Sequence, residues 1–363
     1  MNALLEDIRD NRLLWLLVFV PVVLVAAKLK PDAQTLLFVV SVLAIVPLTV
    51  LLSHATESVA AKIGDALGGL LNATLGNLAE LIIALSALRA GQYMLVKASI
   101  AGPIVTNTLF ILGASFLLGG LKHHVQEYNR ASARMQAALL FLATVALLVP
   151  SAIAHADAAN GAFTHKLSLG LAVVLIVTYG LSMLFSLKTH REVFASVSHG
   201  EGGAEPWPMG LALATLAGVT VLIALVSEIF VESVQTAAAA FGMTPAFVGF
   251  IIVALVGGAS AMPTAFAGAR RNRLDLTVGI ALGSAVQIAL FVAPLLVLAS
   301  YVTGPTPMDL QFWPGAVVML LIATLTATLV TSSGRSAWFV GVLLLMVYVI
   351  FAMTLYLLPP RVS

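Results

Sequence analysis

Long apolar segments dominate this chain and leave little room for a fold outside a lipid bilayer. Of its 363 residues, 60% are hydrophobic and only 9% are charged, whereas soluble globular domains carry about 25% charged residues. So few polar side chains cannot cover a soluble particle of this size, and most of the surface must face hydrocarbon. We therefore predict an all-α polytopic membrane protein, because a helix satisfies its own backbone hydrogen bonds in lipid.

Eleven apolar segments approach the length of a membrane-spanning helix, which requires about 20 residues. They cover residues 13–29, 33–52, 64–88, 94–119, 134–153, 165–187, 208–230, 244–269, 274–301, 311–332 and 336–358. One long polar connection separates the sixth from the seventh, and its Gly, His and Glu content is typical of a solvated loop.

Lys and Arg are distributed unequally between the two predicted sides of the membrane. The side that holds the N-terminus and the loops after the even-numbered spans carries 12 of the 18 basic residues. Because cytoplasmic loops are enriched in Lys and Arg, we predict a cytoplasmic N-terminus and an external C-terminus. The compact chain shows no targeting extension, which favours a prokaryotic inner (plasma) membrane.

The chain resembles itself when it is shifted by 181 residues. ALRAGQYMLVKASIAGPIVTNTLF then lies over GARRNRLDLTVGIALGSAVQIALF without a gap. Five spans separate the two copies, and an odd number reverses the direction of insertion. An inverted repeat of this kind is typical of secondary transporters, which bind substrate near the membrane midplane. The predicted parts are a leading helix at 1–30, a five-helix repeat at 31–188, a cytoplasmic connecting loop at 189–207 and a second five-helix repeat at 208–363.

Glu80 is the most informative polar residue, because it lies inside the third predicted span. A carboxylate there costs about 2.5–3.5 kcal/mol on insertion scales and usually faces a cavity, a cation or a proton pathway. Burial favours its protonated form and a bound cation favours its ionised form, so proton and cation compete as an antiporter requires. The alternative is a glutamate that only hydrogen-bonds a neighbouring helix.

Neutral polar residues accompany Glu80. Asn77 lies one turn earlier on the same helical face, and its amide oxygen suits a hard cation. Ser284 and Gln287 form a polar strip in the ninth span, and Asn107 has a similar position in the fourth. We predict that Glu80, Asn77, Ser284 and Gln287 bind the ion or proton, with Glu80 as the metal ligand. Hydrogen bonding between helices is the alternative for the neutral residues.

Further candidates lie at a predicted helix break and near span ends. In GGASAMPTAFAG of the eighth span, Gly257, Gly258 and Pro263 predict a kinked or locally unwound helix, which could expose carbonyl groups to an ion. The acidic residues near span ends could line entrance vestibules, or could simply be interfacial. These vestibule candidates are Glu57, Glu228 and Glu232.

Several function classes have no support in the sequence. It contains no cysteine, no P-loop and no HExxH motif, so we expect no enzymatic activity and no cofactor. The net charge of +2 is scattered, which gives no support to a nucleic-acid partner. The expected partners are membrane lipid, protons and a transported cation, either calcium or a monovalent ion. The sequence leaves a homo-oligomer open.

Two segments resemble a known family. GGLLNATLGNLAELIIALSALRAGQYMLVKASIAGPIVTNTLFILGASFLLGG resembles the first α-repeat of calcium/proton antiporters of the cation/calcium exchanger superfamily, and VGFIIVALVGGASAMPTAFAGARRNRLDLTVGIALGSAVQIALFVAPLLVLAS is similar to the second. In that family each repeat supplies a glutamate from a GNxxE motif, and the pair exchanges calcium for protons. The resemblance places Asn77 and Glu80 in the first motif, and Ser284 and Gln287 at polar positions of the second repeat.

The second GNxxE motif is broken in this chain. Ala261 stands at the glutamate position, Gly258 at the asparagine position and Met262 at the position of a following histidine. A midplane site with one carboxylate offers one negative charge, whereas calcium sites normally gather more.

Three interpretations therefore stay open at the level of the sequence. The first is exchange of a monovalent cation for a proton. The second is calcium/proton exchange that recruits another carboxylate, such as Glu228 or Glu232. The third is a transport-inactive family member that acts as a sensor or partner subunit.

Overall fold

A computed structural model describes residues 2–153, 161–189 and 206–357 of the chain, and almost all of them are helical. The predicted connecting loop at 189–207 lies mostly outside these residues. The first part of the chain contains α1 (Asn2–Asp10), the 3-10 helix η1 (Arg12–Val18), α2 (Phe19–Leu29), α3 (Gln34–Ile63), α4 (Asp65–Leu75), α5 (Leu78–Arg89), α6 (Tyr93–Val105), the π-helix η2 (Thr106–Ile111), α7 (Leu112–His123), β1 (Val125–Glu127), α8 (Arg130–Ile153), α9 (Gly161–Leu184) and the π-helix η3 (Phe185–Thr189).

The second part of the chain is built in the same way. It contains α11 (Met209–Ala240), α12 (Pro245–Phe247), the π-helix η4 (Val248–Val253), α13 (Ala254–Gly257), α14 (Ala261–Arg270), α15 (Leu274–Gln287), the π-helix η5 (Ile288–Val292), α16 (Ala293–Thr303), α17 (Pro314–Thr331), β2 (Arg335–Ala337) and α18 (Trp338–Leu357). The strands β1 and β2 pair antiparallel, with Gln126 opposite Ser336, and join the ends of α7 and α18.

The predicted all-α membrane fold is confirmed, but the helices divide differently from the eleven predicted spans. Within the described residues, nine helices are long and apolar enough to cross a membrane, and a bent pair of helices (Pro245–Gly257 and Ala261–Arg270) gives up to ten. The predicted span at 64–88 is instead split into α4 and α5, of 11 and 12 residues. Gly76 and Asn77 separate them, and both residue types have low helix propensity.

The break predicted in the eighth span is present. The chain bends by 64° between α13 and α14, at Gly258, Ala259 and Ser260. Pro263 lies within the first turn of α14, where its missing N–H group costs no hydrogen bond.

Corresponding elements of the two parts have nearly the same bounds. A shift of 181 residues places Tyr93, the first residue of α6, on Leu274, the first residue of α15. The same shift places the end of η2 on the end of η5, and the end of α5 on the end of α14. The inverted orientation of the two parts stays a prediction.

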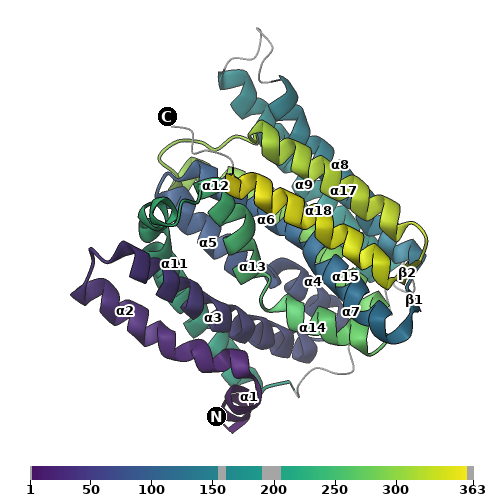
Figure 1. Ribbon diagram of the computed structural model, residues 1–363, viewed down its shortest axis with the longest axis horizontal. Coiled ribbons are helices and arrows are strands. Elements are labelled where there is room, and N and C mark those ends of the chain that lie inside the picture. The colour runs from purple at the N-terminus through teal and green to yellow at the C-terminus, as the bar shows by residue number, and fades with distance from the viewer. Residues whose placement is uncertain (1, 154–160, 190–205, 358–363) are drawn as a thin grey trace.

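The helices form a layered bundle. In Figure 1, α2, α3 and α11 lie along one side, α8, α9, α17 and α18 along the other, and α5, α13 and α14 between them. α3 packs along α11, where Phe38 stacks on Phe230 with ring centroids 5.4 Å apart. The two broken segments therefore lie in the middle of the bundle, between its outer layers.

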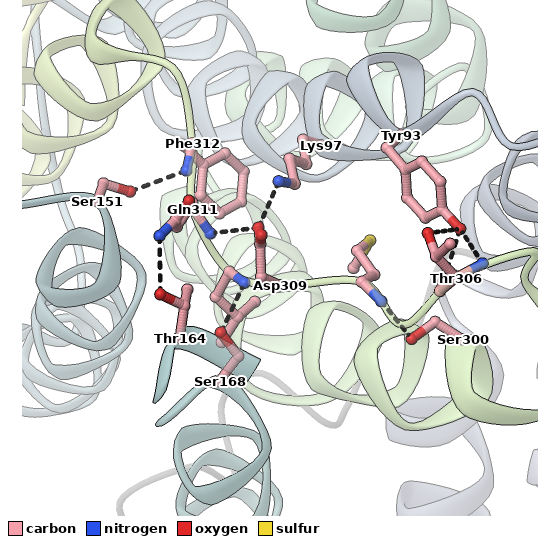
Figure 2. A network of polar contacts seen from close by, with 12 residues as sticks. Tyr93, Lys97, Ser151, Thr164, Ser168, Ser300, Thr306, Asp309, Gln311 and Phe312 are labelled. Atoms are coloured by element: carbon pink, nitrogen blue, oxygen red, sulfur yellow. Dashed lines mark hydrogen bonds and ion pairs between the residues drawn. The ribbon is translucent and has the colours of Figure 1, made fainter. Parts of the chain in front are cut away.

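A network of polar contacts holds the connection between α16 and α17 against neighbouring helices (Figure 2). Lys97 of α6 donates to Asp309 at 2.5 Å, and the Tyr93 hydroxyl accepts the backbone N–H of Thr306 at 2.8 Å. Three serine hydroxyls accept further backbone N–H groups, so this connection keeps its hydrogen bonds although it lacks regular structure. The serines and donors are Ser300 with Met308, Ser168 with Leu310, and Ser151 with Phe312.

Close packing of α6 against η4 predicts a stability difference between two glycine variants. A β-carbon at Gly102 would lie 2.6 Å from Phe250 Cα and 2.8 Å from Phe250 C, so Gly102→Ala must push two backbones apart. We expect a loss of about 1–3 kcal/mol in the free energy of unfolding. Gly218→Ala is the control, since a β-carbon there meets nothing within 4 Å. Thermal unfolding of the purified protein in detergent checks this, and equal midpoints for both variants would contradict the packing.

Candidate functional site

The broken segment α4–α5 and the broken segment α13–α14 meet where Glu80 contacts Gly257. A β-carbon built on Gly257 would lie 2.7 Å from Glu80 Cγ, 2.9 Å from Glu80 Oε1 and 3.0 Å from Glu80 Cδ. The side chain of Glu80 therefore lies directly against the backbone of Gly257, the last residue of α13 before the bend. The absence of a side chain at Gly257 makes this contact possible.

Glu80 combines burial with the lack of a basic partner. It is 6% exposed, and it is buried whereas the other Asp and Glu side chains whose burial the structure describes are not. No Lys, Arg or His in the described part of the chain makes an ion pair with it. Its position in the first turn of α5 places it near free backbone N–H groups, which favour negative charge. A buried carboxylate without a basic partner needs a proton or a cation to offset its charge.

A chain of hydrogen bonds joins three of the predicted polar residues. Asn107 Nδ2 donates to Ser284 Oγ at 2.9 Å, and Ser284 Oγ donates to Asn77 Oδ1 at 2.9 Å. The chain links the break before α5 to η2 and α15. Asn107 lies within a π-helical turn, a feature often found at functional sites.

Gln287 lies on the other side of the break before α5. Its Oε1 would be 3.2 Å from a β-carbon at Gly76, next to Asn77. The side chains of Asn77 and Gln287 are 4% and 8% exposed, and both amide nitrogens are buried without a hydrogen-bond partner among the described residues. The structure thus gathers one carboxyl group and four neutral polar side chains, which we call the midplane cluster after the depth predicted from the sequence: Asn77, Glu80, Asn107, Ser284 and Gln287.

The second broken segment brings no acidic residue to this cluster. Ala261 begins α14, and the Met262 methyl group would lie 3.2 Å from a β-carbon at Gly258. The positions where a second GNxxE motif is expected therefore present apolar groups and backbone. Within the described residues, no three His, Asp or Glu side chains come together as a metal site.

The vestibule candidates lie apart from the midplane cluster. Glu57 is exposed and accepts a hydrogen bond from Ser53 at 3.0 Å on the same helix. Glu228 and Glu232 are exposed on α11. Gln92 Nε2 donates to the carbonyl oxygen of Val231 at 2.8 Å, so this part of α11 is level with the turn after α5, about 13 Å along the helix from Glu80. The structure does not bring Glu228 or Glu232 to Glu80 as a second carboxylate.

Sequence reasoning treated Gly257 only as a kink residue and missed its contact with Glu80. The 181-residue shift aligns Gly257 with Gly76, and this was the available signal. Both glycines leave space beside a cluster side chain, Gly76 for Gln287 and Gly257 for Glu80.

The chain is similar to known proteins along nearly its whole length. The family described as sodium/calcium exchanger protein matches residues 33–188 and 211–357. A Ca(2+)/H(+) antiporter of Aphanothece halophytica is 38% identical over 95% of this chain and 96% of that protein. The Ca(2+)/H(+) antiporter ChaA of Bacillus subtilis is 38% identical over 96% of this chain and 100% of that protein. The solved structure of native YfkE has a TM-score of 0.81 at 35% identity and covers 94% of this chain and 98% of that chain.

The contact between Gly257 and Glu80 predicts a loss of ion binding without a loss of fold. In Gly257→Ala the new methyl group meets a movable side chain, so Glu80 must turn away while the backbones keep their places. We expect the affinity for a bound cation, measured with radioactive calcium as the probe, to fall about tenfold, the result of losing about 1.4 kcal/mol of binding free energy.

The control for this prediction is Gly180→Ala, where a β-carbon meets nothing within 4 Å. Unchanged calcium binding in Gly257→Ala, at an unchanged unfolding temperature, would show that the position of Glu80 against Gly257 is irrelevant to the ion.

Proposed function

Because the chain belongs to the sodium/calcium exchanger protein family, we propose that it is a secondary active antiporter that exchanges Ca²⁺ for protons at Glu80. The observation that carries this proposal is the buried carboxylate without a basic partner, held between two broken helices. Irregular backbone at membrane depth is found where it lines a substrate site. The names of the relatives from Aphanothece halophytica and Bacillus subtilis support calcium as the ion.

Each residue of the midplane cluster has a distinct part in this proposal. Glu80 supplies the negative charge, which a proton or a cation neutralises in turn. Asn77, Ser284 and Gln287 supply neutral oxygens, the ligand type that Ca²⁺ prefers. Exchange follows because the two ions share one carboxylate and each displaces the other as the site opens to either side of the membrane.

The single carboxylate sets the charge moved in each cycle. If Glu80 carries the one proton of the site, a Ca²⁺ ion is exchanged for one H⁺, and one net positive charge crosses the membrane. Moving one charge through 100 mV involves about 2.3 kcal/mol, so the exchange depends on membrane voltage. Support for one proton comes from Ala261, which cannot titrate, and from the exposure of Glu228 and Glu232 on α11, in contrast to the buried Glu80.

The alternatives from the sequence find no support in these relatives. The relatives from Aphanothece halophytica and Bacillus subtilis are named as Ca(2+)/H(+) antiporters, and neither name describes a monovalent-cation exchanger, a sensor or an enzyme. The chain is an integral membrane protein. We propose a prokaryotic inner membrane, a cytoplasmic N-terminus, and entrance vestibules lined by Glu57, Glu228 and Glu232.

Removal of the carboxylate tests the proposed function. In inverted vesicles that hold a proton gradient, we expect wild-type protein to dissipate the gradient when Ca²⁺ is added, and Glu80→Gln to respond like empty vesicles. The matched control is Glu127→Gln, which loses only an exposed ion pair with Arg335 and keeps full activity. A response to Na⁺ or K⁺ alone would contradict calcium exchange, and full activity of Glu80→Gln would remove Glu80 from the mechanism.

A glutamate at position 261 should change the number of protons exchanged for each Ca²⁺. In Ala261→Glu we expect the number of protons exchanged for each Ca²⁺ to rise from one toward two, with a weaker dependence on membrane voltage. Ala261→Gln, of the same size but without the charge, should keep the wild-type ratio. Parallel measurement of calcium and proton fluxes at clamped voltage checks this, and a wild-type ratio of two would show that another group already carries the second proton.

A further inference from the structure

The hydrogen-bond chain of the midplane cluster has a direction, and that direction leaves one amide group unused. Asn107 donates to Ser284, and Ser284 donates to Asn77 Oδ1. The oxygen end of the Asn77 amide, which is the end that can bind a cation, is thereby turned toward Ser284. Its Nδ2 group is buried and has no hydrogen-bond partner in the described structure. A buried donor without a partner is uncommon and costs about 1–3 kcal/mol.

The same three residues can make the same two contacts in the opposite direction. A serine hydroxyl both donates and accepts, and an asparagine amide has a donor end and an acceptor end of nearly the same shape. After both amides rotate by half a turn, Asn77 Nδ2 donates to Ser284 Oγ, and Ser284 donates to Asn107 Oδ1. No described hydrogen bond engages Asn107 Oδ1 in the present arrangement, so it is available as an acceptor. The reversed chain loses no hydrogen bond.

We propose that Asn107 is a positioning residue that sets, through Ser284, which end of the Asn77 amide is available to the ion. This inference rests on the proposed function and deepens it by giving the neutral part of the site two states. In the present state the unpartnered group is an NH₂, which repels a cation. In the reversed state it is an oxygen, which is a ligand for Ca²⁺.

A cation selects the reversed state because it interacts differently with the two ends of the amide. The two states contain equal numbers of hydrogen bonds, so a modest difference in binding free energy is enough to shift their populations. Asn77 is the residue directly before α5 and Glu80 lies in the first turn of that helix, so the released oxygen and the carboxylate belong to the same helix end. The reversal therefore couples the η2 turn that carries Asn107 to occupancy of the ion site.

The alternative role for Asn107 is simple packing between η2 and α15, and a change of acceptor separates the two. Asn107→Asp, at alkaline pH that favours the ionised form of the new carboxyl group, can only accept from Ser284. It therefore fixes the reversed direction. We expect about fivefold tighter binding of radioactive calcium to the purified protein, equivalent to one hydrogen bond of about 1 kcal/mol, and a lower maximal exchange rate because release slows.

A double variant separates the effect of the hydrogen-bond relay, which runs from Asn107 through Ser284 to Asn77, from the effect of the added charge. In the Ser284→Ala background the carboxylate remains but the relay is broken, so Asn107→Asp should no longer change calcium affinity. Thr144→Val is the structural control, because it removes a buried 2.8 Å contact with Thr324 between other helices. It should leave calcium affinity unchanged. A packing role for Asn107 would lower the unfolding temperature without opposite changes in affinity and maximal rate.

The binding and exchange measurements test the relay and the proposed function separately. The relay is overturned if Asn107→Asp tightens calcium binding equally in the Ser284→Ala background. It is also overturned if Asn107→Asp alone leaves calcium affinity unchanged. If the wild-type protein binds calcium and the variants show the expected changes in affinity, but no calcium is exchanged for protons, the relay holds and the proposed function is overturned. Wild-type protein that binds neither calcium nor sodium overturns both.

If Asn107→Asp does not fold, Asn107→Leu and Ser284→Ala carry the same test. Asn107→Leu acts on Asn77 only through Ser284, so once Ser284 is replaced by alanine it should change calcium affinity no further. Additive losses would overturn the relay.

Discussion

The rest of the structure surrounds one buried carboxyl group, whose ionised form needs a cation to offset its charge. Glu80 is buried against the backbone of Gly257, and no basic side chain of the described residues pairs with it. Such a group is costly in a membrane protein unless a mobile ion meets it. Both broken helices can be understood from this requirement, because each break brings polar backbone or a polar side chain to the carboxylate while the surrounding spans keep the site away from lipid.

The surroundings of Glu80 are asymmetric. The break between α4 and α5 contributes Glu80 and Asn77, whereas the break between α13 and α14 contributes no acidic residue. A two-carboxylate site can exchange a divalent cation for two protons, and a one-carboxylate site leaves a net charge to cross the membrane. In the proposed exchange, the neutral amides and the serine hydroxyl supply most of the oxygen ligands.

The sequence was sufficient for much of the fold and for the candidate residues. Hydropathy located the membrane helices, and the glycines around Gly257 predicted the bend before α14. The isolated carboxyl group of Glu80 marked the candidate site, because the cost of placing a charge in an apolar span can be read from the local sequence. The split of the third span at Gly76 and Asn77 was missed, since the segment remains apolar across it. The Glu80–Gly257 contact and the direction of the Asn107–Ser284–Asn77 chain arise from packing of distant segments, which no local pattern encodes.

The central claim is that one carboxyl group alternately holds a proton and a cation. Infrared difference spectroscopy of the purified protein, recorded with and without Ca²⁺, observes that exchange directly. We predict that Ca²⁺ removes one carbonyl-stretch band of a protonated carboxyl group, and that this band is absent from Glu80→Gln in either condition. A spectrum in which Ca²⁺ binds while the protonated-carboxyl region stays unchanged would contradict the claim.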